Sequence, residues 1–255
     1  MRIKTLGAHN CESLTTRLTS ILIDDTIVID AGSVTSSLTL AEQRSLKAVI
    51  VTHQHYDHIK DLPLLAFNFA MAWAELKVYS TPPVFDALSL LLGSKLYPNF
   101  LKFPEENPTV KFHTIEASRT EEIAGYRVLP VPVNHSVFTV GYQITDPDGK
   151  TVFYTGDTGP GLKYCWESVS PQLLITEVSA PDRFETLYRA RRHFTPKLLK
   201  EELLAFREIK GYLPKIVIVH MNPDLEAEIK AELEAAAREL DHPITTAYEG
   251  MNNTL

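Results

Sequence analysis

Short apolar runs separated by turn residues characterise the first part of the chain. The runs Ser20–Ile23 and Thr26–Ile29 are rich in β-branched residues, and Asp24-Asp25 between them predicts a hairpin turn. Ala31-Gly32 then ends the second run. The continuous run Ala48–Thr52 is typical of a strand that is buried on both faces. The pattern therefore begins as a series of short strands.

The spacing of apolar residues becomes helical at Leu62 and stays helical through Trp73. A strand is predicted at Lys77-Val78-Tyr79, and a further helix at Val84–Leu92. The irregular segment Tyr97–Phe100 follows that helix. Helices thus come after the first run of strands.

The second half of the chain again shows strands followed by helices. The predicted strands are Tyr126–Leu129, Val137–Ile144, Val152–Tyr154, Leu173–Thr176 and Lys215–Val219. Pro147-Asp148-Gly149 predicts a hairpin turn between two of these strands. Thr195 suits an N-cap and Pro196 the first helical position, which predicts a helix at Pro196–Ile209. Leu225–Leu240 predicts a charged amphipathic helix.

No linker, internal repeat or change of composition divides the sequence, so we interpret residues 1–255 as a single domain. Two runs of strands, each followed by helices, suit an α/β fold in which two sheets pack face to face with helices outside. Periodicity alone does not distinguish this arrangement from other α/β folds.

Acidic residues outnumber basic ones, and the formal net charge is -7. No stretch concentrates Lys and Arg on a predicted face. A long nucleic acid is therefore not an expected partner, because affinity for nucleic acid rests on neutralising phosphates with basic side chains. A small anionic substrate remains compatible with this charge, since bound metals supply local positive charge.

The first residues, MRIKTLGAHNCES, lack the apolar core of a signal peptide. The apolar stretch from Leu62 to Leu76 is shorter than the roughly 20 residues that a membrane span needs. Cys11 and Cys165 are far apart and form no CxxC pattern, so no disulfide scaffold is expected. We expect a cytoplasmic protein without a membrane partner, and a homodimer as the default oligomer.

Three imidazoles and a carboxylate fall within six residues directly after the buried run. They are His53, His55, Asp57 and His58. Histidines two residues apart in an extended loop can converge on one metal, and Asp57 and His58 can face a second metal as the chain turns. Imidazole and carboxylate suit zinc, iron or manganese. The spacing HxHxDH at a strand end favours a metal site over a chance surface cluster.

Three further polar residues end apolar runs later in the chain. His135 follows Val131–Asn134, Asp157 follows the run that begins at Val152, and His220 follows Ile216–Val219. A scaffold strand presents functional groups at such positions. Each residue alone suits a core histidine or a turn carboxylate, but together with HxHxDH they indicate one shared metal site.

These residues resemble the five ligand motifs of the metallo-β-lactamase superfamily through HQHYDH, His135, Gly156-Asp157 and His220. The opening of the chain also fits this family, with Leu6-Gly7 followed by the hairpin and Asp30-Ala31-Gly32. The resemblance spans nearly the whole chain. It implies an αββα sandwich of two mixed β-sheets with helices on the outer faces and the site along one edge.

The resemblance also implies a ligand set for two divalent metal ions, with zinc first and manganese or iron as alternatives. His53, His55 and His135 would bind the first metal. The second metal would be held by Asp57, His58 and His220. Asp157 would bridge the two.

Shorter motifs resemble the phosphodiesterase branch of this superfamily. Leu174–Ser179 is similar to its strand-plus-Glu element and contains Glu177. Arg192–Pro196 is similar to its His-Leu-Thr-Pro element and contains His193, with Phe194 at a packing position where Leu is usual. The stretches that resemble class II cyclic-nucleotide phosphodiesterases in particular are Ser45–Leu65, Leu96–Phe100, Pro132–His135 and Gly141-Tyr142.

This resemblance implies a hydrolase that cleaves a phosphodiester bond in a small anionic molecule, with a cyclic nucleotide first, by means of a metal-bridging hydroxide. Asp57 would ligate and orient that hydroxide, and His193, oriented by Glu177, would protonate the leaving oxygen. The histidines that match no motif are interpreted as ordinary surface or loop residues: His9, His113 and His242.

Two alternatives stay open at this point. A di-iron protein of the same fold that binds oxygen as a sensor would use the same ligands. A ribonuclease Z-like enzyme would share them too, but it carries a long tRNA-gripping arm between the counterparts of His135 and Asp157, where this chain has only 21 residues (136 to 156). The β-lactamase and glyoxalase-like branches generally lack the pair formed here by Glu177 and His193.

Overall fold

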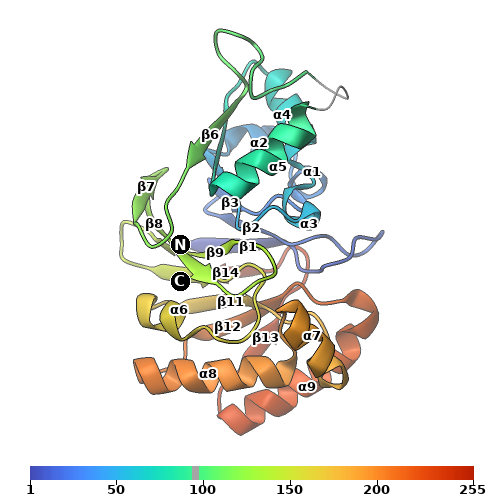
Figure 1. The fold of residues 1–255 in the computed structure, drawn as a ribbon, viewed down its shortest axis with the longest axis vertical. Coiled ribbons are helices and arrows are strands. Elements are labelled where there is room, and N and C mark those ends of the chain that lie inside the picture. Colours follow the sequence, from blue (N-terminus) through green and yellow to red (C-terminus); the bar gives the residue numbers. More distant parts are fainter. Residues whose placement is uncertain (94–97) are drawn as a thin grey trace.

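Two seven-stranded β-sheets pack face to face, and helices cover the outer face of each sheet (Figure 1). This is a computed structural model that describes residues 1–93 and 98–255. The αββα sandwich expected from the sequence is confirmed. Leu96 and Tyr97, which belong to one of the phosphodiesterase-like motifs, lie outside the described residues.

The first sheet is built mainly from the N-terminal half of the chain, in the order β14-β1-β2-β3-β4-β5-β6. Its strands are β1 (Arg2–Gly7), β2 (Ser20–Ile23), β3 (Ile27–Ile29), β4 (Ala48–Ile50), β5 (Leu76–Ser80), β6 (Val110–Thr114) and β14 (Asn252–Thr254). β14 pairs with β1, so the two chain termini lie side by side in the middle of the molecule (Figure 1).

The second sheet has the order β13-β12-β11-β10-β9-β8-β7. Its strands are β7 (Glu121–Ile123), β8 (Tyr126–Val133), β9 (Thr139–Thr145), β10 (Thr151–Tyr154), β11 (Leu173–Glu177), β12 (Lys215–Val219) and β13 (Ile244–Thr246). The predicted hairpin at Pro147-Asp148-Gly149 is present, because β9 and β10 pair antiparallel on either side of it.

Helices near the N-terminus cover the first sheet, and those of the second half cover the other. The first set is α1 (Val34–Ser37), α2 (Leu40–Ser45), α3 (Tyr56–Ile59), α4 (Leu62–Ala70) and α5 (Pro82–Gly93). The second set is α6 (Lys163–Ser168), α7 (Glu185–Arg191), α8 (Pro196–Lys210) and α9 (Glu226–Leu240), with short 3₁₀ turns η1 (Asp182–Phe184) and η2 (Pro223–Leu225). None of the helices in the described ranges combines the length and the apolar character needed to cross a bilayer.

Alternate residues of one strand point to opposite faces, so each strand contributes to two cores. Ile21 on β2 and Ile175 on β11 lie in the core between the sheets. Leu22 packs instead against the helices of the first set, and Leu174 against those of the second. This is why the central strands read as continuous apolar runs in the sequence.

The predicted elements are present with shifted ends. The helix predicted from Leu62 to Trp73 ends at Ala70, because Trp73 has a left-handed φ of 54° that no α-helix contains. The strand predicted from Val137 begins at Thr139. Thr195 occupies the N-cap of α8 as predicted, but its hydroxyl makes no capping hydrogen bond. Thr195 therefore has the backbone position of an N-cap without capping the helix through its side chain.

Parallel pairing brings the polar strand ends together. Strands β3 to β6 are mutually parallel, and so are β10 to β13, so their carboxyl ends meet along one edge of the sandwich. The polar residues at these ends are Asp30 after β3, His53 after β4, Asp157 after β10, Glu177 at the end of β11 and His220 after β12. His135 follows β8, which runs in the same direction as β10 because both pair antiparallel with β9. The candidate site lies at this edge.

Candidate metal centre

The HQHYDH segment leaves β4 as an extended loop and then forms the short helix α3, with His55 as its N-cap. The extended part places the rings of His53 and His55 with centroids 4.6 Å apart. The helical part carries Asp57 and His58 to the next position along the site. His53 and His58 are fully buried, whereas the Asp57 side chain is 31% exposed.

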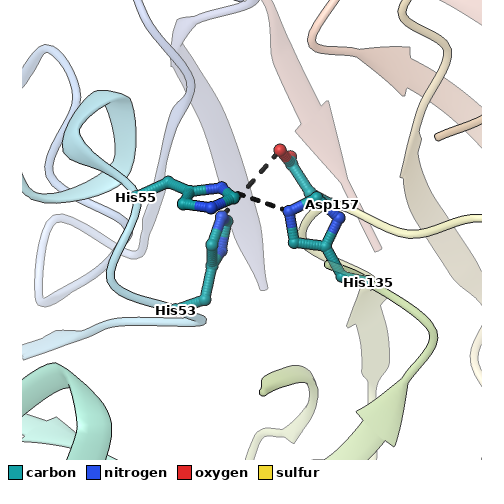
Figure 2. A group of neighbouring side chains, drawn as sticks. All are labelled: His53, His55, His135 and Asp157. Carbon is teal, nitrogen blue, oxygen red and sulfur yellow. Dashed lines mark hydrogen bonds and ion pairs between the residues drawn. The ribbon is translucent and has the colours of Figure 1, made fainter. Parts of the chain in front are cut away.

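Four of the predicted ligands form a first group, whose donor atoms all lie within 4.8 Å of one another: His53, His55, His135 and Asp157. Nε2 of His53 is 3.9 Å from Oδ2 of Asp157, and Nδ1 of His55 is 3.2 Å from Nε2 of His135. Figure 2 shows that the two N-terminal histidines face His135 and Asp157 across the site. The first group therefore joins the two halves of the chain.

A second group has the same compactness and consists of Asp57, His58, Asp157 and His220. Nε2 of His58 is 3.2 Å from Oδ1 of Asp157. Nε2 of His220 is 3.3 Å from an oxygen of Asp57 and 3.3 Å from Oδ2 of Asp157. Asp157 belongs to both groups, which is the place that the resemblance assigns to a bridging ligand. The structure thus brings all seven predicted ligands together, and metal ligation itself stays a prediction.

The donor atoms fit a divalent cation in each group. In the described part of the chain, three buried atoms make no hydrogen bond of normal geometry: Nε2 of His53, and Nε2 of His58 and Oδ1 of Asp157, which lie 3.2 Å apart. Buried polar atoms nearly always have a partner, so three atoms without a normal hydrogen bond that converge on the same site need an explanation. Imidazole nitrogens and carboxylate oxygens are ligands of zinc, manganese and iron, and a cation would satisfy all three atoms.

Electrostatics keep four of these donors in forms that can bind a cation. Burial lowers the pKa of His53 well below its ordinary value, and burial also lowers the pKa of His135. The hydrogen bond from His220 and the nearby His58 overcome burial and lower the pKa of Asp57 to about 2. His220 and His58 likewise hold the pKa of Asp157 well below its ordinary value against the effect of burial. Neutral imidazoles and ionised carboxylates are the metal-binding forms.

The histidines of the first group are oriented by neutral oxygens. Thr52 donates its hydroxyl proton to Asp30, so its Oγ1 accepts from Nδ1 of His53 at 2.9 Å. Nδ1 of His135 donates to the carbonyl oxygen of Arg192 at 3.3 Å. The Arg192 guanidinium in turn donates to the carbonyl oxygen of His135 at 2.6 Å. These contacts direct Nε2 of both imidazoles into the site, where Nε2 of His135 also contacts the hydroxyl of Ser136 at 3.3 Å.

The second group has carboxylates behind its histidines. Nδ1 of His58 donates to Oδ2 of Asp30 at 2.7 Å, and Asp30 is completely buried. Although burial opposes it, the charges of Asp157 and Asp30 raise the pKa of His58 well above its ordinary value. Nδ1 of His220 contacts the hydroxyl of Ser179 at 2.9 Å. Such outer contacts fix the tautomer and ring orientation of a metal ligand.

Gly156 allows Asp157 to enter the site. Its φ is 63°, and a Cβ at this position would lie 3.0 Å from the side chain of Thr52. Both the left-handed backbone and the close packing favour glycine. The Gly-Asp pair seen in the sequence is therefore a requirement of the turn that leads from β10 to the ligand.

Glu177 and His193 lie beside the second group. Nδ1 of His193 donates to Oε1 of Glu177 at 2.6 Å, and donor atoms of these two residues and His220 lie within 4.8 Å of one another. Burial lowers the pKa of His193, but Glu177 outweighs that effect and raises the pKa to about 9. Glu177 is fully buried and the His193 side chain is 18% exposed. Phe194 packs in the core, as predicted for a position that does not react.

Sequence reasoning did not assign a site role to several residues that contact the predicted ligands: Asp30, Thr52, Ser136, Ser179 and Arg192. In the sequence, Asp30 was noted only as part of the motif Asp30-Ala31-Gly32. Its position directly after a buried strand could have indicated that it lies near the site. His9 was interpreted as a surface or loop residue, and it does lie outside the named strands and helices. His9 is not a surface residue but is 4% exposed, because its Nδ1 contacts Oε1 of Glu249 at 2.6 Å under the end of the chain.

The fold agrees with the comparison to known families. The family model described as "Beta-lactamase superfamily domain" matches residues 25–241. The chain belongs to the metallo-β-lactamase superfamily. Within this superfamily it is 28% identical over 125 residues to a metal-dependent hydrolase of Myxococcus xanthus, which covers 47% of this chain and 40% of that protein. The chain spans less than half the length of the curated relatives it matches.

Two solved structures of similar fold cover the whole chain. Unliganded yeast PDE1 superposes with a TM-score of 0.83 at 15% identity, over 100% of this chain and 99% of that one. The short form of human tRNase Z superposes with a TM-score of 0.68 at 15% identity, over 100% and 99%. At this identity the likeness shows the metallo-β-lactamase fold of the chain.

Proposed function

We propose that this chain is a metal-dependent hydrolase that cleaves a phosphodiester bond in a small molecule, with a cyclic nucleotide as the first candidate. The observation that carries the proposal is the position of the Glu177–His193 pair beside two donor groups that share Asp157. A site with this composition combines metal ligands with a group that can protonate a leaving oxygen. The similarity to yeast PDE1 in fold supports the choice of reaction class.

The metal requirement follows from the donor groups. Two divalent cations, with zinc first and manganese or iron as alternatives, would be held by the first and second groups with Asp157 between them. They would supply Lewis acidity to the phosphate oxygens and lower the pKa of water. The positive charge needed to bind an anionic substrate would then come from the cations, in a chain whose formal net charge is -7.

Asp57 is the carboxylate that meets incoming water. Its side chain is 31% exposed, whereas that of Asp157 is 3% exposed. The contact with Nε2 of His220 at 3.3 Å fixes one of its oxygens. The exposed part of the carboxylate can accept a hydrogen bond from the attacking water and so orient it toward the phosphorus.

His193 is the proton donor to the leaving oxygen. Glu177 accepts from its Nδ1 at 2.6 Å, which leaves Nε2 as the nitrogen that can reach the substrate. Glu177 is buried and held by the backbone N–H of Thr158 at 2.9 Å, so the pair is oriented before the substrate arrives. A positioned acid of this kind contributes roughly 10²–10⁴-fold to the rate.

The surroundings of the site support a small substrate over a folded RNA. Residues 136 to 156, between His135 and Asp157, form the compact β9–β10 hairpin, with Thr145 opposite Thr151. No long arm extends from this part of the described chain. Together with the acidic net charge, this favours a substrate that contacts the site mainly through its phosphate.

The proposal is tested by loading the purified protein with zinc, manganese or iron and assaying bis(p-nitrophenyl) phosphate, then 3′,5′- and 2′,3′-cyclic nucleotides. We expect metal-dependent hydrolysis of the chromogenic diester and of at least one cyclic nucleotide. Absence of hydrolysis with every metal would refute the proposal. An iron chromophore that responds to oxygen would then indicate a sensor, and cleavage of a precursor tRNA alone would indicate a ribonuclease Z-like enzyme.

A further inference from the structure

Ser179 lies two residues after the end of β11 and is 1% exposed. Its hydroxyl donates to Oε2 of Glu177 at 2.7 Å and contacts Nδ1 of His220 at 2.9 Å. One hydroxyl therefore connects the carboxylate that orients the proton donor to a predicted ligand of the second group. Glu177 ends β11 and His220 follows β12, and the Ser179 side chain lies between these two residues.

The carboxylate of Glu177 is fully occupied by donors. Oε1 accepts from Nδ1 of His193 at 2.6 Å and from the N–H of Thr158 at 2.9 Å. Oε2 accepts from Ser179 and from the N–H of Phe194 at 3.4 Å. Each oxygen has one side-chain donor and one backbone donor, so the carboxylate cannot rotate without breaking several contacts. Its two side-chain donors lead to His193 on one side and to His220 on the other.

Counting protons assigns the tautomer of His220. A serine hydroxyl has one proton, and here that proton points to Glu177, an acceptor-only group. The Ser179 oxygen must therefore accept from His220, so the proton of that imidazole is on Nδ1. In the neutral imidazole this is the only ring N–H, so Nε2 has a lone pair directed at the second group, where it lies 3.3 Å from Asp57 and Asp157. This is the tautomer that a metal ligand bound through Nε2 requires.

The rings of His193 and His220 are arranged as a matched pair. Their planes differ by 6° and their centroids are 5.8 Å apart, so the two rings are nearly parallel. Nδ1 of His193 lies 2.6 Å from Glu177, and Nδ1 of His220 reaches the same carboxylate through Ser179. One buried carboxylate thus connects to both imidazoles: its Oε1 contacts His193 directly, and its Oε2 connects to His220 through the Ser179 hydroxyl.

We propose that Ser179 is a positioning residue that sets the tautomer and orientation of His220 from the same carboxylate that orients His193. Glu177 then serves two purposes: it holds the proton donor directly and one metal ligand through the Ser179 hydroxyl. The inference rests on the proposed function, and it assigns to Ser179 a role that couples metal binding in the second group to the placement of the proton donor.

The test is chelator-competition titration of zinc with the wild type and with Ser179→Ala. The variant lacks the hydroxyl, so His220 loses its oriented contact, and we expect one of two binding steps to weaken by about 10–100-fold. The other step changes by less than about twofold, and kcat falls more than KM rises. Ser179→Thr retains a hydroxyl and restores most of the lost affinity. Where Ser179→Ala does not fold, Ser179→Cys, with a thiol that donates weakly, gives the same comparison.

A matched control is Ser80→Ala. Ser80 is also a fully buried serine, but it lies in the first sheet and its hydroxyl donates to the carbonyl oxygen of Val51 at 2.6 Å. Removing it lowers thermal stability without changing either zinc-binding step. A loss of zinc affinity equal to that of Ser179→Ala would show that any buried serine has this effect, and would overturn the role assigned to Ser179.

A double-mutant cycle with Glu177→Gln tests whether Ser179 acts through Glu177. If it does, the effects of the two substitutions on zinc affinity are not additive, because both break one hydrogen-bonded chain. Additive effects overturn the proposal, and so does wild-type affinity for zinc in Ser179→Ala. These titrations need no substrate. A wild-type protein that binds two zinc ions but hydrolyses nothing would refute the proposed function and leave the Ser179 test intact.

Discussion

The two donor groups share Asp157 but differ in what lies behind their histidines. In the first group, His135 donates to a backbone carbonyl oxygen, and His53 reaches a carboxylate only through the hydroxyl of Thr52. In the second group, His58 donates directly to buried Asp30, and His220 reaches Glu177 through Ser179. The second group therefore has the closer connection to negative charge.

This difference has a consequence for metal binding. A carboxylate behind an imidazole raises its basicity and fixes its orientation, and both effects strengthen the bond to a cation. A neutral carbonyl oxygen provides orientation with less charge. We therefore expect the second group to retain its cation longer than the first when a chelator is added.

Asp157→Ala should abolish metal binding in both groups and so remove the difference between them. Asp157 is the one residue whose carboxylate belongs to the two sets of donor atoms. We expect both metals to be lost and hydrolysis to fall to background, as measured by elemental analysis and by the diester assay. Asp148→Ala, in the exposed turn between β9 and β10, is the control and should keep both metals. Full metal occupancy in Asp157→Ala would contradict the assignment of Asp157 as a ligand.

His193→Ala should separate catalysis from metal binding. The imidazole contacts Glu177 and lies at the edge of the second group, so its loss removes the proton donor and leaves the seven ligands in place. We expect turnover to fall by roughly 10²–10⁴-fold with metal content unchanged. His113→Ala, which removes an imidazole from β6, should leave turnover at the wild-type value. Loss of metal from His193→Ala would mean that His193 is itself a ligand.

Asp30→Asn should weaken the second group more than the first, because Asp30 contacts His58 directly and His53 only through Thr52. The amide keeps the shape of the side chain but removes the charge behind His58. We expect the affinity of the metal in the second group to fall by about 10–100-fold, and that of the metal in the first group to fall less. Chelator titration followed by elemental analysis measures this, and unfolding curves check that the variant folds. Asp24→Asn, which removes the charge of the carboxylate that accepts from Tyr126 far from the site, is the control. Equal weakening of both metals would remove the basis of the comparison.

His9→Gln should change stability alone. Burial lowers the pKa of His9, but Glu249 and Glu226 outweigh it and raise the pKa above 6.5. The charged form is therefore favoured in the folded state, and its contribution is complete below pH 6.5 and lost as the pH rises through the higher folded value. We expect the variant to lose about 1.5–3 kcal/mol of unfolding free energy at low pH and less at high pH.

Denaturant unfolding from about pH 5.5 to 9 measures this difference between His9→Gln and the wild type. Metal content should not change in the variant, because Glu249 and Glu226 belong to neither donor group. A difference in stability that grows with pH would show that His9 is neutral in the folded protein. Such an outcome would also show that a buried histidine beside a carboxylate does not suffice to raise a pKa in this fold.

Local spacing determined the candidate ligands. HxHxDH after a buried strand placed four of them, and His135, Asp157 and His220 each follow an apolar run that forms a strand in the structure. Strand ends are readable from sequence because a buried strand has a continuous apolar pattern and a polar residue ends it. The hairpin turn at Asp24-Asp25 was predictable because these two polar residues separate two apolar runs. In the structure both residues take the positive φ that such a turn requires.

The contacts behind the ligands were decided by tertiary structure alone. Asp30 meets His58 across 28 positions, Ser179 meets His220 across 41, and Arg192 meets His135 across 57. No pattern in the sequence pairs such residues, because the order of the strands in each sheet sets which strand ends become neighbours. The sequence by itself determined which side chains can bind a metal, and the folded sheets decided which oxygen orients each of them.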